Sequence, residues 1–92
     1  MEKIYQATLE RWGADAQYDQ TIEECAELIA ALKHFKRGKI TRQAVIDELA
    51  DATLMLGQLR WMFGTDQVDA AISKKIDKLN HLLTSTEKNE KG

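Results

Sequence analysis

Residues 23–51 read EECAELIAALKHFKRGKITRQAVIDELAD, with an acidic cluster at each end of an apolar and basic run. Because residues three and four apart share one face of an α-helix, Glu24 and Glu27 are expected to project together from a first helix. Glu48 and Asp51 have the same spacing and are expected to project together from a second helix. Each of two successive helices therefore presents a pair of carboxylates.

These acids have no basic partner at the spacing that forms salt bridges within a helix. The residues four positions after them are uncharged: Leu28, Ala31, Ala52 and Met55. Two like-charged pairs occur at this spacing instead, Glu23 with Glu27 and Asp47 with Asp51, and each destabilises an isolated helix by ~0.2–0.5 kcal/mol. A solvated helix face held by salt bridges is therefore a poor description of either cluster.

Neighbouring helices joined by a short connection usually pack antiparallel, which would bring the two carboxylate pairs face to face. At ~5 Å and an effective dielectric constant of ~20, each close pair of negative charges repels by roughly 3 kcal/mol. Several such pairs would rival the total stability of a small domain, ~5–15 kcal/mol. Raised pKa values could neutralise the cluster with protons. A cluster of carboxylate oxygens also selects Mg²⁺ or Mn²⁺, and the pattern favours the cation.

The motif Glu-Glu-x-x-Glu at residues 23–27, followed by Glu-x-x-Asp at residues 48–51, resembles the signature of the all-α nucleoside triphosphate pyrophosphohydrolases, the MazG-like family. The resemblance covers residues 10–82 and includes three further segments: Trp12-Gly13, Gln17 and Lys75-Ile76-Asp77-Lys78-Leu79. It implies an all-α, MazG-like four-helix bundle that binds Mg²⁺ or Mn²⁺. The implied reaction hydrolyses a nucleoside triphosphate to its monophosphate and pyrophosphate, which would suit a role in clearing nucleotides from the cellular pool.

The resemblance also implies roles for the individual acids. Metal ligation is expected from Glu24, Glu27, Glu48 and Asp51. Glu23 belongs to the motif, but its direction on the helix differs from that of Glu24 by ~100°. It is expected to complete the site or to hold a neighbouring ligand or water in place. Glu23 or Glu27 is the expected general base that takes a proton from the attacking water.

Substrate contacts are expected outside the acidic clusters. Lys75 and Lys78 share a helical face and match basic positions of the family, which implies triphosphate binding; a solvated face is the alternative. Trp12 and Gln17 would supply a ring for stacking on the base and an amide, with core packing as the alternative. Residues 79–83 read LNHLL and depart from the asparagine and arginine that many members of the family carry there. This departure leaves the base and the sugar undetermined.

A second group of charges precedes Gly38 and consists of Lys33, His34, Lys36 and Arg37. Cations at this place complement the negative end of a helix dipole, and that structural role accounts for all four. A share in phosphate binding is the second interpretation for Lys33 or Lys36.

The composition describes a small helical protein of 92 residues, with 43% apolar residues, 30% charged residues and no proline. The net charge of −2 argues against the basic footprint of a protein that binds DNA or RNA. No signal-peptide layout and no apolar run of ~20 residues is present, so we expect a cytoplasmic protein without a membrane partner. The single Cys25 is expected to be a small core residue.

Apolar spacing and helix-stop signals predict four helices at residues 2–12, 15–37, 41–64 and 66–84, with the second and third as a central antiparallel pair. Residues 1–84 are expected to form one domain, and residues 85–92 a mobile tail. A chain of this size buries only ~60–65% of its unfolded surface. A homodimer or homotetramer is therefore expected to complete the fold.

Three other interpretations compete with this one. A di-iron bundle requires Glu-x-x-His, but Ala31 and Lys78 stand three residues before His34 and His81. Phosphoribosyl-ATP pyrophosphohydrolase shares the acidic motif and the size, and is an alternative within the enzyme class. A non-catalytic helical interaction protein is the alternative outside that class.

Overall fold

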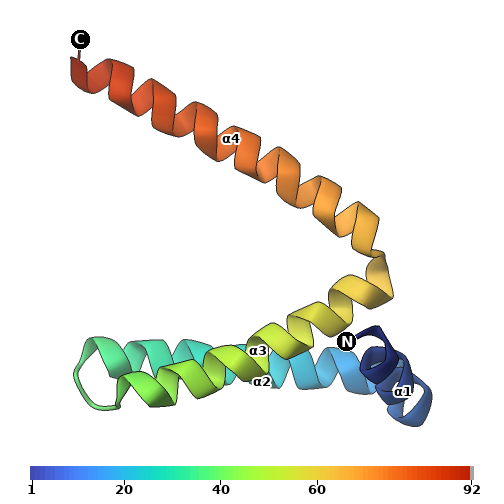
Figure 1. The fold of residues 1–92 in the computed structure, drawn as a ribbon. Helices are drawn as coiled ribbons and strands as arrows, with labels where there is room; N and C mark the ends of the chain where they lie inside the picture. Colours follow the sequence, from blue (N-terminus) through green and yellow to red (C-terminus); the bar gives the residue numbers. More distant parts are fainter. Residues whose placement is uncertain (92) are drawn as a thin grey trace. The chain divides into compact units, whose positions relative to one another are not determined.

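The computed structural model describes the backbone of residues 1–91 and the side chains of residues 1–85, and over this range it contains helices and no strands. The helices are α1 (Glu2–Trp12), α2 (Ala14–Lys36), α3 (Arg42–Phe63) and α4 (Thr65–Lys91), as Figure 1 shows. The predicted all-α class with four helices is therefore confirmed. The chain divides into two compact units, Met1–Met62 with α1, α2 and α3, and a second unit that begins at Phe63 and contains α4.

Each predicted helix boundary except the last lies within one residue of the observed one. The last prediction was wrong, because α4 continues beyond residue 84 to Lys91. Residues 65–91 contain neither glycine nor proline, so nothing in the backbone chemistry stops the helix where its apolar residues end. The side chains after Ser85 lie outside the described residues, and the mobile tail at residues 85–92 stays a prediction.

A single glycine joins α1 to α2. Gly13 has a φ angle of 85°, which is open to glycine and strained for other residues. Its N–H donates to the carbonyl oxygen of Leu9 at 2.8 Å and closes the last turn of α1. The sharp turn allows α1 to pack against α2.

A buried amide holds α1 in register with α3. The Gln58 side chain is 2% exposed, and its Nε2 donates to the Tyr5 carbonyl oxygen at 3.0 Å. The Thr8 hydroxyl donates to Gln58 Oε1 at 2.8 Å. On α2, Gln17 Nε2 donates to the Thr8 carbonyl oxygen at 3.3 Å. These bonds satisfy buried polar groups and fix α1 to both of the longer helices of its unit.

A short turn lets α3 run antiparallel to α2 (Figure 1). Gly38 adopts a φ angle of 70° in this turn. Thr41 then caps α3, because its Oγ1 accepts a hydrogen bond from the Ala44 N–H at 3.2 Å. The turn places the start of α3 beside the end of α2, and the acidic clusters of the two helices come together.

Large apolar side chains of the described chain are mostly exposed, and its buried apolar residues are Tyr5, Ala31 and Ala52. On α2, Ile22 and Ile29 are 67% and 57% exposed. The seam of α4 is also exposed and comprises Ile72, Ile76, Leu79 and Leu83. No helix within the described residues is both long and apolar enough to cross a membrane. Removing these exposed apolar side chains from water would require a further contact with another surface.

Candidate metal centre

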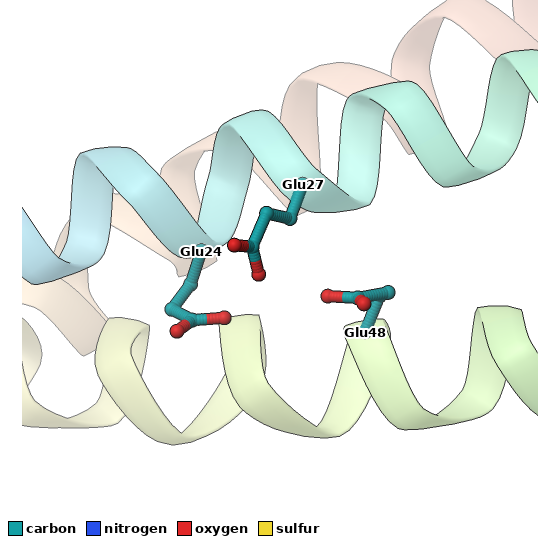
Figure 2. Close-up of side chains that lie close together, drawn as sticks. All are labelled: Glu24, Glu27 and Glu48. Atoms are coloured by element: carbon teal, nitrogen blue, oxygen red, sulfur yellow. The ribbon is translucent and has the colours of Figure 1, made fainter.

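Three glutamates from two helices meet on the facing sides of α2 and α3. Figure 2 shows Glu24 and Glu27 projecting from α2 toward Glu48 on α3. Each side chain offers one carboxylate oxygen, and these oxygens all lie within 4.8 Å of one another. The spacing of three residues on α2 and the antiparallel course of α3 produce this convergence.

We call Glu24, Glu27 and Glu48 the triad. Two of its carboxylate oxygens, Glu24 Oε2 and Glu48 Oε2, are buried and have no hydrogen-bond partner among the described residues. Glu24 Oε1 accepts a hydrogen bond from Gln20 Nε2 at 2.7 Å, which orients the carboxylate. A buried acceptor without a partner costs ~1–3 kcal/mol, and more when it is charged. The arrangement therefore leaves two oxygens available to a positively charged ligand.

The charges of the triad act on Glu27. Repulsion from Glu24 is the main reason that the pKa of Glu27 is raised above its ordinary value of 4.5. Desolvation and a hydrogen bond with Glu24 raise this pKa further, as do the charges of Glu48 and Glu23. A proton on Glu27 would thus relieve Glu24 by a hydrogen bond, but the Oε2 of Glu48 would keep no partner.

Two other predicted acids lie outside the triad. Asp51 is exposed on α3, one helical turn after Glu48, and is not part of the group whose oxygens lie within 4.8 Å. Glu23 is exposed on α2 and also outside that group, although its charge acts on Glu27. Asp47 uses one carboxylate oxygen to accept a hydrogen bond from Gln43 Nε2 at 2.9 Å. The structure thus brings together three of the four predicted ligands.

A pocket at the junction of the three helices contains the predicted base-binding residues. Its volume is about 420 Å³, and its lining comprises Thr8, Trp12, Ala16, Gln17, Gln20 and Met55. The Trp12 side chain is 63% exposed, so its ring is not packed in the core. Gln17, by contrast, is buried at 6% exposure. Gln20 lines this pocket and also donates to Glu24, so it links the pocket to the triad. Our sequence interpretation missed Gln20, although a glutamine four residues before a glutamate is a known helical pair.

The predicted phosphate-binding lysines belong to the second unit. Lys75 and Lys78 lie on α4 and are exposed. Their spacing of three residues places them on one face of that helix, as expected. Both of their ammonium groups are accessible to an anionic ligand.

The description of the triad comes from the geometry of this protein alone and not from comparison with a related protein. The chain matches no protein-family model, no curated protein and no solved structure. The chemistry of the site is therefore inferred from the positions and charges of its residues.

Proposed function

We propose that this protein is a Mg²⁺-dependent nucleoside triphosphate pyrophosphohydrolase with a MazG-like helical fold. The observation that carries the proposal is that Glu24 and Glu48, whose carboxylates meet from two helices, each keep one buried oxygen, Oε2, without a hydrogen-bond partner among the described residues. A proton shared by Glu24 and Glu27 leaves Glu48 unsatisfied, whereas a cation among the three carboxylates satisfies all of them.

The donor set fits a hard divalent cation. Mg²⁺ prefers oxygen ligands at ~2.0–2.1 Å in octahedral geometry, so two oxygens bound to one ion lie ~3–4 Å apart. The oxygens of the triad lie within 4.8 Å of one another, so small rotations of the side chains bring them to that separation. No histidine or cysteine belongs to the triad, which argues against a softer metal. Mn²⁺ has similar oxygen chemistry and is the expected substitute.

The reaction requires one water molecule and releases pyrophosphate. Bound Mg²⁺ would neutralise phosphate oxygens and lower the pKa of a coordinated water. Glu23 or Glu27 would accept the proton of the attacking water. The anhydride bond between the α and β phosphates breaks, and the products are a nucleoside monophosphate and pyrophosphate. Glu23 suits the base role because it stands beside the triad without belonging to it.

The remaining predicted residues are assigned to the substrate or to a second ion in this proposal. Trp12 stacks on the base at the mouth of its pocket. Gln17 lines the same pocket, and the base would use the hydrogen-bonding capacity that its amide keeps beyond the bond to the Thr8 carbonyl oxygen. Asp51 acts as a ligand to a second ion or through a bound water, since it is outside the triad. Lys75 and Lys78 belong to the second unit, and triphosphate binding by these lysines stays a prediction from the resemblance to the family.

We further propose that the protein acts as a homodimer or homotetramer. The exposed apolar side chains on the long helices support this assembly, because a monomer would leave them in water. Light scattering coupled to gel filtration measures the assembly directly. A stable, folded monomer would contradict it.

The activity is tested by measuring pyrophosphate release from canonical and modified nucleoside triphosphates, with phosphoribosyl-ATP included in the panel. We expect release that requires Mg²⁺ or Mn²⁺, stops in EDTA and is lost in Glu24→Ala and Glu48→Ala. Asp47→Asn is the matched control, because it removes an exposed acid outside the triad. Inactivity of the wild type across the panel with metal present would favour the non-catalytic interaction protein.

A further inference from the structure

A groove between α2 and α3 runs from the triad toward the turn that joins these helices. Its volume is about 290 Å³. Glu27 and Glu48 line one end, and His34 lines it seven residues further along α2. Two helical turns, ~10 Å along the axis, therefore separate the carboxylates from the imidazole. The sequence motif of the proposed family does not include His34.

Small side chains create the space in this groove. Ala30, Ala31 and Ala44 line it between the carboxylates and the histidine. Because alanine has no atom beyond Cβ, these positions leave room between two helices that larger residues would fill. Ala31 is buried, whereas Ala30 is exposed.

The two ends of the groove have opposite electrostatic character. The carboxylates at one end attract a cation. At the other end, which the apolar Ile40 also lines, α3 begins, and the positive end of its dipole favours an anion. The carbonyl oxygen of His34 already accepts hydrogen bonds from the N–H groups of Arg37 and Lys39, at 3.1 and 3.0 Å. These bonds reduce the repulsion that the last carbonyls of α2 would exert on a phosphate.

We propose that this groove holds the pyrophosphate portion of the substrate, with an imidazole N–H of His34 donating a hydrogen bond to a phosphate oxygen. The inference rests on the proposed function and adds a substrate-binding residue to it. An imidazole has at least one N–H donor whether it is neutral or charged. His34 lines the groove, whereas Lys33 and Lys36 do not, so the histidine replaces them as the phosphate contact of the basic cluster.

Calorimetric titration with magnesium pyrophosphate tests this role without catalysis. We expect the wild type to bind and His34→Ala to bind about 10-fold more weakly or worse, which is the loss expected for one hydrogen bond to a charged group. His34→Gln keeps an N–H donor and should recover part of the affinity. Lys36→Ala is the matched control, because it removes a charge from the same helical turn but not from the groove. Mg²⁺ alone should bind all four proteins equally.

Ala30→Leu provides a second test that does not depend on the histidine. The position is exposed, so the helix accepts leucine, but the longer side chain occupies the groove. Pyrophosphate binding should fall while Mg²⁺ binding stays unchanged. A wild type that binds Mg²⁺ but not pyrophosphate, or equal pyrophosphate affinity in wild type, His34→Ala and Ala30→Leu, would overturn this inference alone. Failure of the wild type to bind Mg²⁺ would overturn the proposed function as well.

Discussion

Replacing Glu48 with glutamine should change stability in opposite directions with and without Mg²⁺. The reason is that Glu48 and Glu24 place carboxylate oxygens within 4.8 Å of each other, and one oxygen of each is buried. Two unit charges at that separation repel by roughly 3.5 kcal/mol at an effective dielectric constant of ~20. Because both side chains are only half-buried, solvent screening reduces this figure to about 1 kcal/mol.

Without metal, Glu48→Gln should therefore be more stable than the wild type by about 1 kcal/mol. In a domain of this size, that difference raises the melting temperature by ~4–8 °C. With Mg²⁺ at 100 times its dissociation constant, the wild type gains ~2.7 kcal/mol by mass action. The variant has lost a charged ligand and should gain much less. The order of the two melting temperatures should thus reverse when Mg²⁺ replaces EDTA.

Thermal unfolding followed by circular dichroism measures both differences in one pair of buffers. Asp47→Asn is the matched control, since it removes a neighbouring acid that is outside the triad and should leave the response to Mg²⁺ intact. A variant that is less stable than the wild type in EDTA would refute the repulsion. An undiminished response of Glu48→Gln to Mg²⁺ would refute the role of Glu48 in binding.

Three further changes test other parts of the structure. In EDTA, the wild type should lose stability relative to Glu27→Gln as the pH rises from 4.5 through the raised pKa of Glu27. The reason is that the Glu27 carboxyl group holds its proton more tightly in the folded state than in the unfolded chain. Melting temperatures of the two proteins that run parallel at every pH would contradict this. Gln20→Ala should weaken Mg²⁺ binding about 10-fold or more in calorimetry, because Gln20 orients Glu24, and equal affinity would show that the orientation is unimportant. Gly57→Ala should destabilise the protein by ~1–2 kcal/mol in urea unfolding, because the added Cβ overlaps the Tyr5 hydroxyl. This is the opposite of the usual effect, since alanine in place of glycine normally stabilises a helix by ~1 kcal/mol. Combining Gly57→Ala with Tyr5→Phe should restore most of the lost stability. A Gly57→Ala variant that is more stable than the wild type would show that α1 and α3 are not held this closely.

Local chemistry made most of the fold predictable from sequence. Gly13, Gly38 and Gly64 all adopt positive φ angles at helix ends, and the sequence interpretation placed the breaks there. The end of α4 was mispredicted because the loss of apolar residues was treated as a stop signal. A helix backbone continues through polar residues until a glycine, a proline or a cap interrupts it.

The candidate site was predictable only as far as helical periodicity extends. Spacing placed Glu24 and Glu27 on one face, and the short turn after α2 brought Glu48 to meet them. Periodicity does not give the rotation of α3 about its own axis, so it could not show that Asp51 is exposed outside the triad. The contribution of His34 depends on the alanines of a groove formed by two helices, and no pattern within one helix reveals such a space.

Soaking crystals with Mn²⁺ and locating the ion by its anomalous scattering tests the central claim most directly. We predict a strong peak within bonding distance of Glu24 Oε2 and Glu48 Oε2, with Glu27 as a third contact. The contrary result is that the same two carboxylates point into bulk water and that no peak lies between α2 and α3, at a Mn²⁺ concentration that saturates other carboxylate metal sites. That result would contradict the metal centre and the hydrolase proposed from it.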